Sequence, residues 1–149
     1  MESPFNDEFF MNKALQEAQM AYQKNEVPIG AVIVVNDKII ARAHNLTETL
    51  NDVTAHAEMQ AFTAASDFLG GKYLKKCTLF VTLEPCQMCA GASYWTQIDR
   101  IVFGASDENR GFQKNKTKLH PKTKIIGGVL EKECSLIITN FFIEKRSLN

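Results

Sequence analysis

The chain contains, from residue 78 to residue 89, the stretch Thr78-Leu79-Phe80-Val81-Thr82-Leu83-Glu84-Pro85-Cys86-Gln87-Met88-Cys89. Residues 78–82 are short, apolar and rich in strand formers, which predicts a buried strand. Pro85 is suited to opening a helix, which we expect to run to about residue 96. Cys86 and Cys89 are three apart, so both sulfurs can lie on one face of the first turn, where the helix N-terminus favours thiolates. The stretch therefore predicts a strand-to-helix junction that presents two thiolates.

The segments on either side of this junction alternate between helical and extended patterns. Helical spacing and capping residues predict helices from residues 6–8 to about 25, over 55–68 and over 131–146. Extended patterns predict strands over 31–35, 38–43, 101–103 and 125–129, the last weakened by two glycines, with a hairpin turn at Asn36-Asp37. No internal repeat or low-complexity segment interrupts the pattern. We therefore expect residues 1–149 to form one α/β domain with helices covering a central sheet of about five strands.

A second motif, His56-Ala57-Glu58, supplies an imidazole and a carboxylate at the expected start of the second helix. Residues i and i+2 of a helix lie about 200° apart around its axis. His56 and Glu58 are spaced in this way, so they cannot both bind a metal on the flank of the helix. If His56 binds a metal, Glu58 is left free for proton transfer. An imidazole and the thiolates of Cys86 and Cys89 can hold zinc, and three protein ligands leave a position for water.

A Cys-x-x-Cys pair alone has other interpretations: a redox pair, half of a structural zinc site, or chance. The remaining candidates for a fourth ligand form no second spaced pair; they are Cys77, Cys134, His44 and His120. The joint occurrence of His-x-Glu and Pro-Cys-x-x-Cys is the zinc-deaminase signature. The sequence therefore favours a catalytic zinc over a structural one.

Four stretches of the chain resemble the bacterial tRNA-specific adenosine deaminases, and the similarity runs over nearly the whole sequence. They are Glu26-Val27-Pro28-Ile29-Gly30-Ala31, Thr54-Ala55-His56-Ala57-Glu58, residues 82–92 and Val102-Phe103-Gly104-Ala105. The resemblance implies a three-layer α/β/α cytidine deaminase-like fold with a mixed sheet, and a homodimer with one zinc per subunit. It implies that the zinc ligands are His56, Cys86 and Cys89. It also implies that Glu58 is the general acid and base, that Asn45 contacts the target base and that Ile29 lines the base pocket.

Composition agrees with a compact enzyme rather than a membrane or disulfide-rich protein. The chain has 149 residues, is 45% hydrophobic and contains four cysteines, two of them in the motif. Its first ten residues are not a basic region followed by an apolar run, and no segment approaches about 18 uninterrupted apolar residues. A soluble cytoplasmic protein with no membrane segment is expected. The 17 basic and 17 acidic residues cancel, so no overall charge attracts nucleic acid.

One segment, residues 110–124, is nevertheless strongly basic. It carries one arginine and five lysines with no acidic residue, together with Phe112 and His120 as possible stacking groups. Such a segment can contact phosphates and stack an unpaired base, as recognition of an RNA loop requires, although a solvated basic loop has the same composition. This segment departs from the pattern of the better-known family members.

Three functions follow as hypotheses. The first is deamination of adenosine to inosine at the wobble position of a tRNA anticodon loop. The second is deamination of a free nucleobase or nucleoside of the guanine or cytosine type, although guanine deaminases usually have proline where this chain has Gln87. The third is a non-catalytic RNA-binding zinc module, for which Glu58 would be dispensable.

Overall fold

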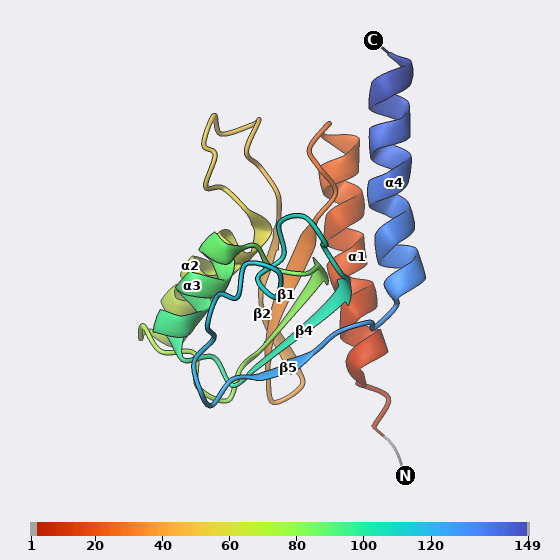
Figure 1. Ribbon diagram of the computed structural model, residues 1–149. Coiled ribbons are helices and arrows are strands. Elements are labelled where there is room, and N and C mark those ends of the chain that lie inside the picture. The colour runs from red at the N-terminus through yellow and green to blue at the C-terminus, as the bar shows by residue number, and fades with distance from the viewer. Residues whose placement is uncertain (1–2, 149) are drawn as a thin grey trace.

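The computed structural model describes residues 3–148, and in it helices and strands alternate along the chain (Figure 1). In order they are α1 (Asp7–Gln23), β1 (Gly30–Val35), β2 (Lys38–His44), α2 (Ala57–Leu69), β3 (Thr78–Leu83), α3 (Gln87–Thr96), β4 (Arg100–Ala105), β5 (Lys124–Ile126) and α4 (Glu131–Ser147). Residues 1, 2 and 149 lie outside the described part of the predicted domain.

The strands form one mixed sheet in the order β2-β1-β3-β4-β5. β1 is antiparallel to both of its neighbours, whereas β3, β4 and β5 are parallel. Side chains alternate between the two faces: Ala31 and Ile33 of β1 enter one core, and Val32 and Val34 enter the other. Both faces of the sheet are therefore buried, which requires helices on each side.

Helices α2 and α3 lie side by side on one face of the sheet, and α1 and α4 lie on the other (Figure 1). α2 packs on β1 and β2, while α1 packs on β1 and β3 and α4 on β4. The predicted three-layer α/β/α arrangement with a mixed five-stranded sheet is confirmed. Within residues 3–148, none of the helices is both long and apolar enough to cross a membrane.

Several predicted boundaries differ from the structure by one to three residues, and the backbone explains two of them. The first helix ends at Gln23 instead of residue 25, because Asn25 adopts a left-handed conformation with φ of 61°. The fifth strand ends at Ile126 instead of residue 129. Gly127 lies directly against the ring of Phe103, and Gly128 has φ of 89°, so the regular strand ends there, although Gly128 N–H still donates to the carbonyl of Gly104 at 3.1 Å.

Candidate metal and active site

Three metal-binding side chains meet where α2 and α3 begin. His56 is the N-cap of α2 and Cys86 the N-cap of α3, and Cys89 follows in the first turn of α3. Nδ1 of His56 lies 3.7 Å from Sγ of Cys86 and 3.6 Å from Sγ of Cys89. Pro85 precedes the cap, so the helix begins two residues later than this proline suggests.

The spacing of these three atoms fits zinc. The ligand atoms of His56, Cys86 and Cys89 all lie within 4.8 Å of one another. Tetrahedral zinc, with Zn–S near 2.3 Å and Zn–N near 2.05 Å, separates a sulfur from a nitrogen ligand by about 3.6 Å. Two sulfurs and one imidazole nitrogen at this spacing could hold the ion and leave one coordination position open.

The two thiols are electrostatically unequal. A hydrogen bond with Cys89 and one with His56 lower the pKa of Cys86 to about 4. The same contact, together with burial, raises the pKa of Cys89. A lowered pKa favours the thiolate form that metal binding requires, and the hydrogen bonds within the group supply it at Cys86.

Glu58 is a buried carboxyl beside this group. It is the second residue of α2 and only 4% exposed. Burial raises the pKa of Glu58 to about 7; the charge of Cys86 raises it further, and the charge of His56 lowers it. A carboxyl with a pKa near neutrality can both accept and return a proton.

The two residues expected to contact a base lie next to each other. Asn45 follows β2 and is 5% exposed, and its backbone N–H donates to the carbonyl of Ile29 at 3.0 Å. Ile29 is half-buried and packs against the core that contains Ala57 of α2. In residues 3–148, no hydrogen bond involves the Asn45 side-chain amide. Every fully buried side-chain polar atom in this part of the chain has a hydrogen-bond partner, so the unpaired amide atoms of Asn45 are not fully buried. The amide therefore stays available at a surface.

Two buried carboxylates outside the predicted set hold the loops around the group. Glu26 is fully buried and accepts hydrogen bonds from Glu48 N at 3.1 Å and from Thr49 N and Oγ1, both at 2.6 Å. It thereby fixes the loop between Asn45 and His56.

Glu84 acts similarly at the other half of the group. Its carboxylate accepts from the backbone N–H groups of Asp107 and Gln113, both at 3.0 Å, and Gly111 packs directly against it. It therefore fixes the start of the basic segment next to Cys86. The sequence signal for Glu26 and Glu84 was an acidic residue inside or beside an apolar run.

The basic segment 110–124 lies mainly on the surface, but one of its two predicted stacking groups is buried. Arg110 and the five lysines are exposed. Phe112, however, is 6% exposed and packs edge-on against Phe103, so it cannot stack on a base. His120 is half-buried and lies against Tyr94 of α3, with ring centroids 5.6 Å apart.

Comparison with known proteins identifies the family. Residues 4–105 match the cytidine and deoxycytidylate deaminase zinc-binding region. A tRNA-specific adenosine deaminase of Bacillus subtilis is 44% identical over 94% of this chain and 91% of its own length. The chain belongs to the tRNA-specific adenosine deaminase family. As a member of this deaminase family it is a hydrolase that uses zinc, and the His56, Cys86 and Cys89 group suits that cofactor.

Solved structures extend the comparison for this deaminase. A structure from a study of A-to-I editing by tRNA:A34 deaminases is 41% identical, covers 86% of this chain and 97% of its own, and has a TM-score of 0.78. A guanine deaminase of Bacillus subtilis is 39% identical over 68% of this chain and 65% of its own, with a TM-score of 0.65. The match therefore extends further along the tRNA deaminase than along the guanine deaminase.

Proposed function

We propose that residues 1–149 form one zinc-dependent domain that deaminates adenosine to inosine at the wobble position of a tRNA anticodon. The observation that carries the proposal is the group of His56, Cys86 and Cys89 beside buried Glu58. The tRNA-specific relative that covers nearly the whole chain supports the choice of substrate.

The chain's own residues divide the work of this reaction. His56, Cys86 and Cys89 hold the zinc, which when bound supplies Lewis acidity that activates water. Glu58 takes a proton from the attacking water and returns it to the departing amino group. The water oxygen replaces N6 on C6 of adenine, and ammonia leaves, so the products balance as inosine and ammonia.

Asn45 and Ile29 orient the base in this proposal. The unused amide of Asn45 can hydrogen-bond the base or ribose, because it offers both a donor and an acceptor. Ile29 lies directly beside Asn45 through the backbone hydrogen bond and offers an apolar wall for the ring. Burial of Asn45 and Glu58 restricts water around the reacting atoms.

The exposed cations of residues 110–124 bind the anticodon arm. Glu84 fixes the start of this segment against the junction that carries Cys86. Phosphates bound along the segment would therefore lie at a defined place relative to the metal group. His120, on Tyr94, is the stacking candidate that remains, because Phe112 is buried.

We further propose that the enzyme is a homodimer and works in the cytoplasm, where its tRNA substrate is found. Helix α3 and the end of α2 expose large apolar side chains, as a subunit interface would. They include Phe68 at 68%, Tyr94 at 38% and Trp95 at 77% exposure.

One alternative has a specific observation in its favour. The similarity to a guanine deaminase covers 68% of the chain, so a free nucleobase is the second candidate substrate. A non-catalytic RNA-binding zinc module is the third, but it gives no reason for a buried carboxyl beside the metal group.

A parallel substrate assay tests the proposal. The zinc-loaded protein is incubated with an anticodon stem-loop and separately with free adenosine, guanine and cytosine, while inosine and ammonia are measured. We expect inosine from the stem-loop alone, with an apparent affinity that weakens steeply as salt rises. Ammonia from a free base, unaffected by salt and with an unchanged stem-loop, would contradict the RNA substrate. Stem-loop binding without product, unchanged in Glu58→Ala, would contradict an enzyme.

A further inference from the structure

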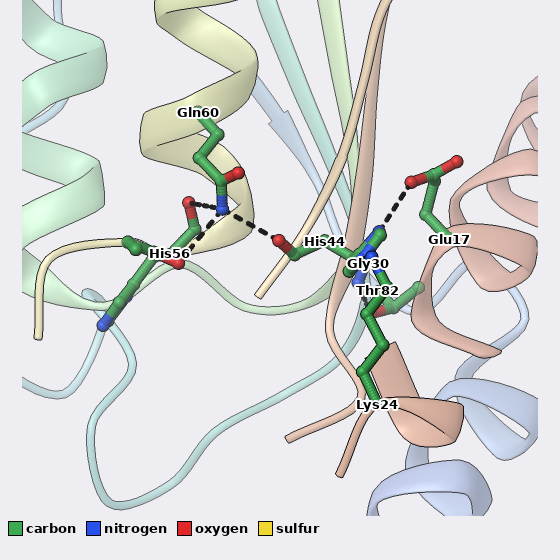
Figure 2. Close-up of polar contacts among 8 residues, drawn as sticks. Glu17, Lys24, Gly30, His44, His56, Gln60 and Thr82 are labelled. Carbon is green, nitrogen blue, oxygen red and sulfur yellow. Dashed lines mark hydrogen bonds and ion pairs between the residues drawn. The ribbon is translucent and has the colours of Figure 1, made fainter. Parts of the chain in front are cut away.

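Gln60 lies half-buried in the first turn of α2, and its side-chain amide points back toward the start of the helix (Figure 2). Nε2 of Gln60 donates to the carbonyl oxygen of His44 at 2.8 Å and to that of Ala55 at 3.1 Å, and lies 3.4 Å from that of His56. An amide nitrogen carries two hydrogens, so the two shorter contacts use both. One side chain therefore connects the end of β2 to the start of α2.

The two segments joined in this way carry different parts of the site. His44 directly precedes Asn45, and Ala55 directly precedes His56. A loop separates the two segments along the chain, so covalent geometry does not fix the distance between Asn45 and His56. A backbone hydrogen bond from Leu46 N–H to the Ala55 carbonyl, at 3.0 Å, joins the two segments, and the Gln60 amide adds a second link between the carbonyls that immediately precede Asn45 and His56.

His44 is also held from the opposite face of the sheet (Figure 2). Its Nδ1 lies 2.9 Å from Oε1 of Glu17, and its Nε2 lies 3.0 Å from Nζ of Lys24. A lysine ammonium only donates, so Nε2 accepts and Nδ1 carries the proton given to Glu17. Glu17 of α1 and Lys24, which follows that helix, hold the ring of His44, and Gln60 binds its carbonyl, so the position of His44 is constrained from both faces of the sheet.

We infer that Gln60 is a positioning residue that sets the placement of Asn45 relative to His56, and so of the base relative to the metal. The inference rests on the proposed roles of these two residues. An error of about 1 Å in the placement of reacting groups can reduce the rate by up to about 100-fold. Gln60 acts through the backbone and touches neither substrate nor metal.

Two variants separate this role from simple packing. Gln60→Met keeps the length of the side chain and removes both donors. Gln60→Glu keeps the shape and, when ionised, places a carboxylate against two carbonyl oxygens. The matched control is Gln16→Met on α1, an exposed helical residue on the opposite face of the sheet. Each variant is measured for thermal unfolding, for the absorption spectrum of its cobalt-substituted form, and for kcat and KM on the stem-loop.

We expect Gln60→Met to lower kcat roughly tenfold with a smaller change in KM, because positioning is lost and affinity is not. We also expect a shifted cobalt spectrum, because His56 is no longer held in place, and a larger effect of both kinds in Gln60→Glu. Gln16→Met should match the wild type. A lower melting temperature with unchanged kcat, KM and cobalt spectrum would overturn the inference and leave Gln60 as a packing residue.

The cobalt spectrum keeps this test separate from the proposed function. If the wild-type protein fails to act on the stem-loop, the proposed substrate is wrong. The spectra of the Gln60 variants still show whether this side chain positions His56, because they need no substrate. A spectrum that is the same in wild type and both variants would then overturn the inference by itself.

Discussion

Nδ1 of His56 lies 3.6 Å from Sγ of Cys89, although the two residues are 33 positions apart in the chain. They belong to two helices on the same face of the sheet, and each lies at or within the first turn of its helix. The start of a helix carries unpaired N–H groups and a positive potential, which stabilises thiolates. The sheet therefore brings together at one place the ligand types that zinc prefers.

Removing one thiolate should remove the metal. Cys89→Ala leaves two protein ligands, so we expect zinc content to fall from about one ion per chain to nearly none. Elemental analysis after dialysis measures this. Cys77→Ala is the control, because Cys77 is a buried free thiol outside the metal group. Full zinc retention in Cys89→Ala would contradict the ligand assignment.

Glu58→Gln should separate metal binding from catalysis. The amide cannot carry a proton between water and the amino group, so we expect deamination to fall by about 10²- to 10⁴-fold. Zinc content should remain that of the wild type, because the carboxyl is not among the three grouped ligands. Single-turnover kinetics and metal analysis on the same sample check both halves. Activity within about twofold of the wild type would remove Glu58 from the mechanism.

Glu26 should make folding stability depend on pH. Burial alone would raise its pKa, but hydrogen bonds from Thr49 and Glu48 outweigh burial and lower the pKa below the usual value. The ionised form therefore stabilises the fold above the unfolded-state pKa, near 4.3, and this contribution is lost as pH falls through the lower folded-state value.

The variant Glu26→Gln tests this sign directly. It loses the charged acceptor, so we expect it to be less stable than the wild type at pH 7 by about 1–3 kcal/mol. The difference in free energy of unfolding between the wild type and Glu26→Gln should become smaller as pH falls below about 4.3, because only the wild type has a carboxylate to lose. Urea unfolding at a series of pH values measures it. A difference that stays constant with pH would show that the carboxylate charge contributes nothing.

Gly111→Ala should disturb the basic segment while leaving the zinc ligands in place. A Cβ at Gly111 would overlap the Glu84 carboxylate and the carbonyl of Asp107, so the loop must shift at a cost of about 1–3 kcal/mol. We expect weaker stem-loop binding at unchanged zinc content. Gly71→Ala is the matched control, because a Cβ there meets nothing within 4 Å. Equal RNA affinity in both variants would show that the conformation of the basic segment does not contribute to RNA binding.

Local sequence patterns predicted most of the fold. Alternation and apolar runs located the five strands, because the sheet is buried on both faces and its side chains are selected by that burial. The pattern failed at Gly127 and Gly128, where contact with Phe103 and backbone conformation decide the strand end. The two glycines weakened the predicted strand, but a contact between distant segments leaves no local signal that fixes the residue at which the strand ends.

The candidate site shows the same division. His56 and Cys86 could be predicted, because imidazole and thiol side chains in these motifs indicate metal binding. Gln60 gave no such signal, because its role depends on carbonyl groups that any residue could supply. Phe112 was mispredicted as a stacking group, because an aromatic ring in a basic loop has the same composition whether it faces RNA or the core.

The most direct test of the central claim is a measurement of inosine by mass spectrometry in two anticodon stem-loops. One carries adenosine at the wobble position, and the other carries it one position away in the same loop. The zinc-loaded enzyme should convert the first and leave the second unchanged, and removal of zinc should stop the reaction. Equal conversion of both loops, or none with ammonia released from a free base instead, would contradict the assignment as a wobble adenosine deaminase.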